Sequence, residues 1–295
     1  MENQGAYMDS QPKGAASFEI RGCRVTEVEC RSVLNKSGIA DYAVNCYAGC
    51  EHACAYCYAR FVTRFSHPGE AWGSFVDVKL NSAQVLEREA RRKKVGTVFL
   101  SSVCDGWQPL EARHGLTRQC LEILLHYRYP VSILTKSALA GRDLDLLTSG
   151  KDVEFGVTLT TVDARLAQLI EPRSSPPDAR LAVLQDARSR GVSTYAFLGP
   201  LMPGLCDSQE NLTALLEAVR EAGVAYFYVD RLNRRFGVWQ SLKGLLQAHF
   251  PGLIEEYRRV FFDEAASAGY SDRLVSTVGS LARSLGLDGK MRLCL

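Results

Sequence analysis

The sequence predicts an α/β fold in which helices cover a parallel sheet, and three observations support this prediction. Apolar strand-like segments alternate with amphipathic helical segments between residues 42 and 229. Several strand candidates are apolar on both faces, which is typical of parallel strands buried between layers. Polar residues and cysteines gather where these strands end. An open doubly wound sheet and a barrel share this periodicity, so the pattern leaves both open.

Each unit has its own signal. Short apolar runs predict strands, and apolar residues repeating every three to four positions predict helices, the first with Ser82 as N-cap. The predicted strands are Tyr42–Cys46, Phe75–Leu80, Thr97–Val103, Val131–Thr135, Val153–Thr160, Ser193–Leu198 and Val224–Val229. The predicted helices are Ser82–Lys93, Leu116–His126, Gly141–Thr148, Asp163–Leu169, Asp178–Ser189 and Asn211–Glu221.

Three regions follow from this pattern. Residues 1–33 form an N-terminal extension, partly disordered and partly extended. Residues 34–232 carry the strand–helix units and the cysteine cluster. Residues 233–295 lose that rhythm and predict about three amphipathic helices, which we expect to cap the α/β unit.

The composition excludes several classes of protein. With 35 basic and 33 acidic residues, bulk charge demands neither a nucleic acid nor a membrane as partner. No stretch approaches the ~18 apolar residues of a membrane span. Ten cysteines in 295 residues are too few for a disulfide scaffold, and the polar N-terminus lacks a signal-peptide core. We therefore expect a cytoplasmic protein with reduced cysteines, monomeric and without a membrane contact.

The segment Asn45–Arg60, NCYAGCEHACAYCYAR, holds Cys50, Cys54 and Cys57 in a C-x3-C-x2-C array. Thiolates this close in sequence can turn onto one metal centre, and iron–sulfur clusters are frequent guests of cysteine-only sites. Three protein ligands leave one iron of a four-iron cluster open. This predicts a position where chemistry takes place.

Cys46 leaves two alternatives open. With Cys50, Cys54 and Cys57 it would complete a tetrahedral zinc site, although structural zinc usually takes two separated C-x2-C-like pairs. It would otherwise bind the fourth iron and close the cluster. We expect Cys46 to have no ligand role.

Polar residues at the strand ends predict a shared rim, because parallel strands place their carboxyl ends at one edge. These residues are Asn45, Lys79, Asn81, Cys104, Asp105, Lys136, Thr158 and Thr160. The cysteine loop follows the first strand at the same edge.

The cysteine array, with Tyr56 before its last cysteine, resembles the signature of radical S-adenosylmethionine (SAM) enzymes. The wider sequence is similar to the spore photoproduct lyase-like branch, also called DNA repair photolyase-like. The similar segments run in the expected order over about two thirds of the chain: Ser32–Arg60, Trp72–Asn81, Phe99–Glu111, Val131–Leu147, Glu171–Arg173 and Leu198–Asp207.

This resemblance implies a partial, six-unit (β/α) TIM-like barrel with a [4Fe–4S] cluster at its carboxyl-end opening. It implies that SAM binds the open iron and is cleaved reductively to a 5′-deoxyadenosyl radical, which abstracts hydrogen from a substrate. It also implies a reduced flavodoxin or ferredoxin as electron donor.

The resemblance assigns SAM contacts to several residues. Tyr56 is expected beside the cluster, and Lys136 and Thr158 at the amino-acid end of SAM. Ordinary packing for Tyr56 and a solvent-facing lysine for Lys136 are the plainer alternatives. No Gly-Gly-Glu run follows the second strand, so Asn81, or else Lys79, is expected to hold the SAM amine.

Two further residues carry predicted roles. Arg173, in Glu171-Pro172-Arg173, suits a bidentate clamp on a carboxylate. Cys104 lies near the position where spore photoproduct lyases carry the cysteine that returns a hydrogen atom to the product radical. Buried filler is its plainer alternative.

Two basic clusters bear on a nucleic-acid partner. Arg88–Lys94 reads as a solvated helix end. Arg231–Arg235 lies near Phe236 and Trp239, and cations interleaved with aromatics suit phosphate contact and base stacking. The leading hypothesis is a radical SAM enzyme acting on a nucleic-acid base, such as a DNA photolesion. Radical chemistry on RNA, a peptide or a small metabolite is the second, and a non-catalytic metal-stabilised binding protein the third.

Overall fold

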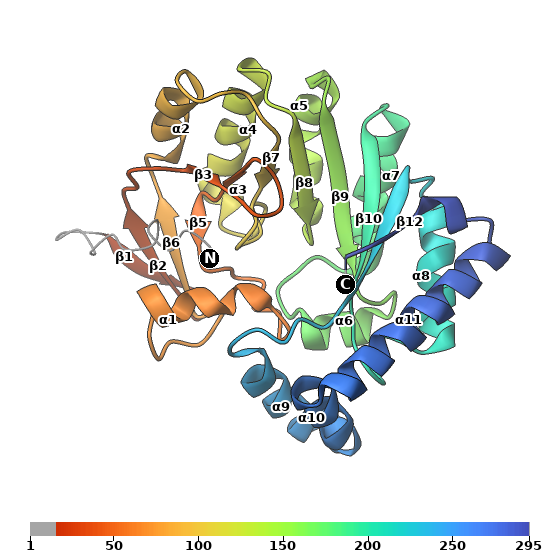
Figure 1. Ribbon diagram of the computed structural model, residues 1–295. Helices are drawn as coiled ribbons and strands as arrows, with labels where there is room; N and C mark the ends of the chain where they lie inside the picture. Colours follow the sequence, from red (N-terminus) through yellow and green to blue (C-terminus); the bar gives the residue numbers. More distant parts are fainter. Residues whose placement is uncertain (1–15, 295) are drawn as a thin grey trace.

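Parallel strands form most of the main sheet in the computed structural model, which describes residues 16–294 (Figure 1). The strand order is β12-β11-β10-β9-β8-β7-β4-β3, and only β3 runs antiparallel to its neighbour. The strands are β3 Leu34–Lys36, β4 Tyr42–Val44, β7 Val98–Leu100, β8 Val131–Thr135, β9 Val153–Leu159, β10 Ser193–Leu201, β11 Tyr226–Arg231 and β12 Met291–Leu293. Among the described residues β3 and β12 do not pair, so the barrel is open and the partial-barrel prediction is confirmed.

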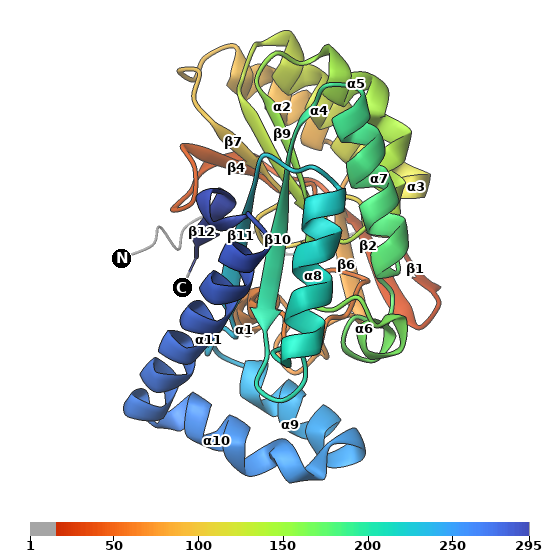
Figure 2. The same ribbon diagram turned by 90° about the vertical axis from the view of Figure 1, so that its right-hand side faces the viewer.

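Helices cover the outer side of this sheet (Figures 1 and 2). They are α2 Ser82–Ala90, α3 Glu111–His114, α4 Leu116–His126, α5 Leu144–Ser149, α7 Pro177–Ser189 and α8 Gln209–Glu221. In α4, Leu116, Cys120, Leu121 and Leu124 are buried, as expected for one apolar stripe. The Ser208 hydroxyl caps α8 by accepting from the backbone N–H of Asn211.

The two faces of the main sheet differ in burial. Along β8, Val131 and Ile133 are fully packed, whereas Ser132 and Leu134, at the alternate positions, are half-buried. Side chains alternate along a strand, so the packed positions meet the helices and the half-buried ones belong to the opposite face. We call this opposite face the inner face.

Aromatic rings fill the amino-terminal half of the inner face. The rings of Tyr195 and Tyr226 stack with centroids 5.3 Å apart, and the guanidinium of Arg292 lies 3.4 Å from the Tyr226 centroid. A Cβ on Gly156 would lie 2.4 Å from the Tyr195 ring, so glycine is required there. The Tyr226 hydroxyl donates to Glu154 at 3.1 Å. These contacts fill the inner face at the amino-terminal ends of the strands. A ligand must therefore approach from the carboxyl ends of the strands.

A second, four-stranded sheet accounts for one difference from the sequence-based expectation. It has the order β1-β2-β6-β5, with β1 Ser17–Ile20, β2 Cys23–Val28, β5 Tyr47–Ala48 and β6 Phe75–Lys79. The predicted strand Phe75–Leu80 exists as β6, but it pairs with β2 and β5, because β4 pairs directly with β7. Residues at the end of β6 therefore leave the main rim.

The C-terminal region contains the expected helices and one unexpected strand. The helices are α9 Val238–His249, α10 Ile254–Phe262 and α11 Glu264–Ser284. Trp239 of α9 packs on Phe261 and Phe262 of α10, with centroid distances of 5.5 Å to each. The Tyr270 hydroxyl donates to the Leu201 carbonyl at 3.1 Å, which fixes α11 against β10.

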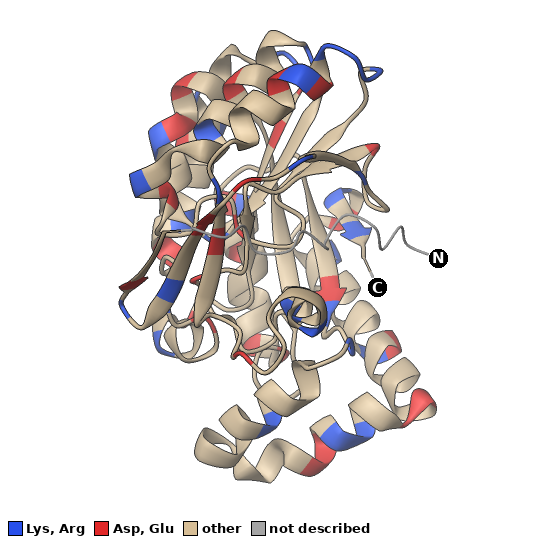
Figure 3. Ribbon diagram, turned by 90° about the vertical axis from the view of Figure 1, so that its left-hand side faces the viewer, with Lys and Arg blue, Asp and Glu red and all other residues tan. Residues whose placement is uncertain are grey.

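Basic and acidic side chains are interspersed over the helices (Figure 3). No helix of residues 16–294 is both long and apolar enough to cross a membrane. The disorder predicted for the start of the chain falls mostly on residues 1–15, which lie outside the described residues.

Candidate active site

The cysteine loop begins directly after β5 and ends in the 3-10 helix η2, Tyr58–Val62, which leads into α1, Thr63–Ser66. Cys50 and Cys54 are buried, with 6% and 5% of their surface exposed, and Cys57 is half-buried. Cys54 and Cys57 both raise the pKa of the Cys50 thiol, after the larger effect of burial. The loop therefore brings the three predicted ligands together.

The Arg60 side chain holds the loop in this shape. Its guanidinium donates to the carbonyls of Cys57 at 3.1 Å, Cys54 at 3.0 Å and Ala55 at 3.1 Å. On the other side, Gly49 has φ +90°, and a Cβ there would lie 2.4 Å from the Phe75 carbonyl. Only glycine fits this approach between the loop and β6.

The donor set fits a thiolate-bound cluster better than a single ion. Burial raises the pKa of Cys54 as a free thiol to about 12, so a bound cation is needed for ionisation. No group of three or more His, Cys, Asp or Glu within residues 16–294 converges on one point as a mononuclear ion requires. A four-iron cluster is larger, and its thiolates bind separate irons. The Cys46 thiol lies 3.4 Å from Cys120 Sγ, on α4, which supports its expected lack of a ligand role.

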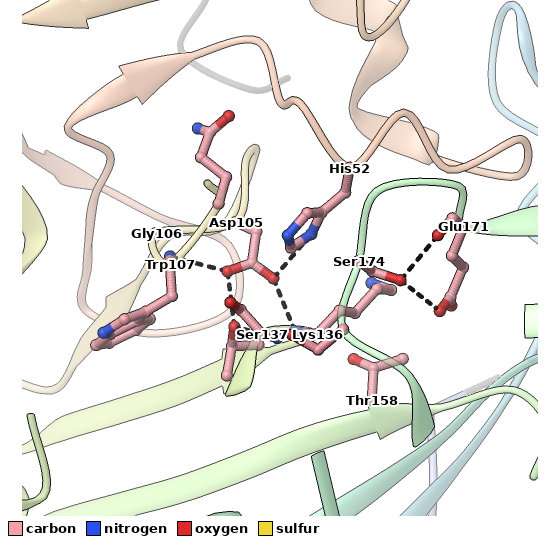
Figure 4. Close-up of polar contacts among 12 residues, drawn as sticks. His52, Asp105, Gly106, Trp107, Lys136, Ser137, Thr158, Glu171 and Ser174 are labelled. Carbon is pink, nitrogen blue, oxygen red and sulfur yellow. Dashed lines mark hydrogen bonds and ion pairs between the residues drawn. The ribbon is translucent and has the colours of Figure 1, made fainter. Parts of the chain in front are cut away.

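Asp105 organises the polar groups beside the loop (Figure 4). Its carboxylate accepts from the backbone N–H of Trp107 at 2.9 Å, the Thr135 hydroxyl at 2.7 Å and the backbone N–H of Lys136 at 2.7 Å. These bonds join the ends of β7 and β8. They fix the backbone from which the Lys136 side chain extends.

His52, between the first two cysteines, faces Asp105. Its Nδ1 lies 3.4 Å from Asp105 Oδ2, but the geometry is not that of a hydrogen bond, and this buried atom has no partner among the described residues. Burial lowers the pKa of His52. The side chain is therefore a neutral imidazole with one ring nitrogen unsatisfied.

Glu171 and Arg180 form a buried ion pair next to the loop. Each side chain is 1% exposed, and the Tyr56 hydroxyl also donates to Glu171. Arg180 donates further to the Thr158 carbonyl at 2.9 Å. Burial alone would raise the pKa of Glu171, but Arg180 and then Lys136 outweigh it and hold the pKa below its usual value. Glu171 is thus an ionised anchor for Tyr56 and β9.

Lys136 brings a positive charge to this site. Its ammonium lies 5.8 Å from the Tyr56 ring centroid and has no hydrogen-bond acceptor within the described part of the chain. Burial opposes its charge, yet Cys54 and Glu171 outweigh burial and raise the pKa of Lys136. Thr158 follows on β9, buried, with no hydrogen bond from its hydroxyl to a described residue. The Lys136 ammonium and the Thr158 hydroxyl, without hydrogen-bond partners among the described residues, have the chemistry to bind the amino-acid end of SAM.

Cys104 lies beside Cys50, the first of the three predicted cluster ligands. It contributes to the raised pKa of Cys50, and its Sγ lies 3.8 Å from Asn45 Oδ1. Burial, followed by Cys46, raises the pKa of Cys104 to about 12. The half-buried thiol therefore keeps its hydrogen at neutral pH.

Two residues predicted to contact SAM already make hydrogen bonds within the chain. The Asn81 amide accepts from the backbone N–H of Cys30 at 2.8 Å and donates to its carbonyl at 3.0 Å, so it holds the N-terminal segment. Lys79, the weaker candidate for the SAM amine, donates to the Asn45 carbonyl at 3.0 Å. Arg173 donates to the Gly73 carbonyl at 3.1 Å. The roles of Asn81 and Arg173 towards SAM stay predictions.

The basic segment at the end of β11 is less available than its sequence suggests. Arg231 donates to Ser271 at 2.6 Å, and Arg234 pairs with Glu264 at 2.8 Å. Arg235 instead lies over the rings of Tyr58 and Phe61, with centroid distances of 5.8 and 5.6 Å.

Sequence reasoning missed Arg180 and the anchoring role of Glu171. The Glu-Pro-Arg motif drew attention to Arg173, whereas the arginine that reaches the site is on the following helix. A buried arginine in α7, within an otherwise ordinary amphipathic pattern, gives no sequence signal of its own.

Comparison with known proteins adds family evidence to this geometry. The sequence model of the radical SAM superfamily matches residues 44–216, more than half of the 295 residues. The chain belongs to the radical SAM superfamily. It is therefore a radical SAM enzyme, and the cofactors of this superfamily are a [4Fe–4S] cluster and SAM.

Relatives extend the match beyond this segment. The uncharacterized protein MJ0683 of Methanocaldococcus jannaschii is 30% identical over 256 residues, covering 86% of this chain and 93% of the relative. The uncharacterized protein Rv2578c of Mycobacterium tuberculosis is 35% identical over 261 residues, covering 82% of this chain and 75% of the relative.

Solved structures share this fold. A variant of spore photoproduct lyase superposes with a TM-score of 0.65 at 13% identity, covering 91% of this chain and 80% of the lyase. A second variant, solved with dinucleoside spore photoproduct, gives a TM-score of 0.58 at 15% identity, covering 76% of this chain and 65% of that structure.

Proposed function

We propose that this radical SAM enzyme acts on a nucleic-acid base, as a lyase-like enzyme that reverses a DNA photolesion, with Cys104 as the hydrogen-atom donor. The observation that carries the proposal is the position of Cys104: a fourth thiol beside Cys50 that keeps its hydrogen. A ligand thiol would need to ionise, whereas a hydrogen-atom donor needs its S–H bond intact.

The residues around the loop divide the binding tasks. Cys50, Cys54 and Cys57 would hold the cluster. Lys136 would pair with the SAM carboxylate, a charge-assisted contact of the kind that is short and strong. When bound, the cluster and SAM supply a 5′-deoxyadenosyl radical.

Thr158 and Tyr56 would complete this binding site. The Thr158 hydroxyl would meet the same end of SAM as Lys136. Tyr56 is held by Glu171 with its ring beside the Lys136 ammonium, and that contact fixes the lysine. The protein thereby orients the cofactor and leaves the radical chemistry to it.

The opposite wall of the inner face supports a planar substrate. Phe197 of β10 and Tyr228 of β11 are half-buried neighbours, with ring centroids 6.0 Å apart. Asp230 follows at the end of β11, and burial raises its pKa to about 7. Aromatic faces stack on bases, and a carboxyl group hydrogen-bonds a base edge. A base in a duplex would be flipped out to reach this wall.

Family structures give the proposal a second line of support. One of the similar folds is a spore photoproduct lyase solved with a dinucleoside spore photoproduct. That ligand is a nucleic-acid photolesion, which matches the aromatic wall here.

The test uses protein reconstituted anaerobically with iron and sulfide, then supplied with dithionite and SAM. We expect 5′-deoxyadenosine, and with an ultraviolet-irradiated thymidine oligonucleotide we expect lesion reversal. In D₂O the Cys104 thiol carries deuterium, so the wild-type product gains it. Cys104→Ala should still form 5′-deoxyadenosine but lose the deuterium transfer.

Controls separate the possible failures. Cys206→Ala removes a buried cysteine that lies after β10, and it should keep deuterium transfer. Formation of 5′-deoxyadenosine without any reaction of the oligonucleotide would contradict the base-directed function. The same assay with RNA, peptide and metabolite pools then identifies the class that reacts. Unchanged deuterium transfer in Cys104→Ala would contradict the donor role alone.

A further inference from the structure

Two segments far apart in the sequence meet at the outer end of the cysteine loop. One is residues 58–66, which form η2 and α1, and the other is residues 231–237, between β11 and α9 (Figure 1). A Cβ on Gly237 would lie 2.9 Å from Arg60 Cδ. The Arg64 guanidinium lies 4.6 Å from the Phe236 ring centroid. These contacts make one continuous surface.

Large aromatic side chains are exposed on this surface. Tyr58, Phe65 and Phe236 have 38%, 50% and 53% of their surface exposed. Single exposed aromatics are ordinary, but several together mark an interaction site. We define the arginine–aromatic patch as Tyr58, Phe61, Arg64, Phe65, Arg235 and Phe236.

The patch is also positively charged. Residues 58–66 and 231–237 contain five arginines and no acidic residue, although the whole chain is nearly balanced. One of these arginines, Arg234, pairs with Glu264 at 2.8 Å. Apolar contacts ringed by cations suit an acidic protein partner, because complementary charge speeds encounter.

The patch adjoins the cysteine loop in sequence and in contacts. Tyr58 follows Cys57, the half-buried member of the three cysteines, whereas Cys50 and Cys54 are 6% and 5% exposed. The Tyr58 hydroxyl donates to the Ser102 carbonyl, so the patch also touches the loop that carries Cys104. An electron entering here would pass next to Cys57, the residue that precedes Tyr58.

We infer that the arginine–aromatic patch is the docking face for an acidic electron-carrier protein of the flavodoxin or ferredoxin class. One electron passes from the reduced carrier to the cluster, with no atom transferred. Interfaces of electron-transfer pairs are small and short-lived, which a patch of six residues suits. The inference rests on the radical SAM assignment and is independent of the substrate.

A nucleic-acid strand is the competing occupant, and the observations favour the carrier. Arg231 donates to Ser271 and Arg234 pairs with Glu264, so both guanidinium groups already have partners within the chain and neither belongs to the patch as defined. The substrate groups proposed above lie on the inner face, whereas the patch lies on the segments that follow the cysteine loop and β11. Tyr58 of the patch is next in sequence to Cys57, a predicted ligand of the cluster that would accept the electron.

The test compares two reductants on reconstituted protein. Photoreduced flavodoxin and dithionite each reduce the cluster in a stopped-flow experiment, followed by the loss of cluster absorbance. In the double variant Arg64→Glu/Arg235→Glu we expect the rate of reduction by flavodoxin to fall about tenfold at low salt. The difference in rate between wild type and variant should shrink as the salt concentration rises. The dithionite rate should stay within about twofold of wild type, because a small reductant needs no docking face.

Two control variants separate charge from packing. Arg220→Glu, an exposed arginine in the last turn of α8, makes the same charge change at the opposite end of the strands and should leave both rates unchanged. Arg64→Lys/Arg235→Lys keeps the charge and should recover most of the flavodoxin rate.

Three outcomes would overturn the inference. The first is equal flavodoxin rates in wild type and the double Glu variant. The second is a parallel fall with dithionite, which would mean a damaged cluster site. The third is an unchanged flavodoxin rate with lost oligonucleotide binding, which would assign the patch to nucleic acid. Dithionite-driven formation of 5′-deoxyadenosine tests the radical chemistry separately in every variant.

Discussion

Arg180 donates to the carboxylate of Glu171, and this ion pair joins α7 to the loop that precedes it, in a place water does not reach. Glu171 also accepts from Tyr56, and Arg180 donates to the Thr158 carbonyl. Two residues proposed to contact SAM are thereby positioned through one buried pair. Replacing a whole buried pair by apolar residues is often neutral for stability, whereas removing one partner leaves the other charge buried and uncompensated.

Removing one partner should therefore be costly. Arg180→Met leaves the Glu171 charge buried without its main donor, and we expect a loss of about 3–5 kcal/mol in the free energy of unfolding. Denaturant titration measures it. Arg180→Met/Glu171→Leu removes both charges and should recover much of the loss, and Arg190→Met, on the exposed end of α7, is the matched control. A small effect of Arg180→Met would contradict the role of the pair.

The contribution of His67 to the stability of the fold decreases as the pH rises. Its Nδ1 lies 2.9 Å from Glu70 and its Nε2 lies 2.8 Å from Asp77, while Arg24 also contacts Glu70. Burial would lower the pKa of His67, but Asp77 and Glu70 outweigh it and the net pKa is raised. Its stabilisation is full below the unfolded pKa, about 6.5, and is lost as pH rises through the folded value.

We therefore expect the stability advantage of wild type over His67→Gln to be largest at pH 6 and to shrink towards pH 9. Denaturant unfolding across this range measures the difference. His249→Gln, at the end of α9, is the matched histidine control. A difference that stays constant with pH would exclude the imidazolium as its source.

Lys136 should contribute mainly to SAM binding. Lys136→Met keeps the length of the side chain but removes the ammonium, and losing a charge-assisted contact should weaken SAM by about 1.5–3 kcal/mol. Isothermal titration of the reconstituted protein with SAM measures this. Lys151→Met, on the exposed turn before β9, is the control. Unchanged affinity would favour the plainer reading of Lys136 as a solvent-facing lysine.

The cysteine-to-alanine variants should differ sharply in their iron content after reconstitution. Cys50→Ala, Cys54→Ala and Cys57→Ala should each lose the cluster after reconstitution. Cys46→Ala should keep both the cluster and SAM cleavage, because its thiol contacts Cys120. Iron analysis and electron paramagnetic resonance report the outcome. A cluster that survives in Cys46→Ala without SAM cleavage would show that Cys46 matters to the open iron.

The sequence pattern predicted those helices and strands that depend mainly on residues close together in the chain. The limits of α4 and β8 agree with the predicted segments, because each is a complete amphipathic or buried run between turn residues. The cysteine spacing also predicted that Cys50, Cys54 and Cys57, the proposed cluster ligands, lie close together, because all three belong to one short loop.

The features that the sequence did not predict depend on contacts between segments far apart in the chain. Asn81 was expected at the rim, but β6 joined the second sheet and carried Asn81 towards Cys30. Arg180 was unpredictable because its partner is set by how α7 returns beneath the loop. The strand β12 is short and gains its place only by pairing with β11.

The Arg60 guanidinium binds three carbonyls of the cysteine loop, and none of those bonds involves iron. The loop is thus preorganised by the polypeptide, unlike a zinc finger, whose fold depends on its metal. The apoprotein would retain its tertiary structure when the cluster is lost to oxygen. Damage of that kind is then repairable by supplying iron and sulfide again, with no need to refold the chain.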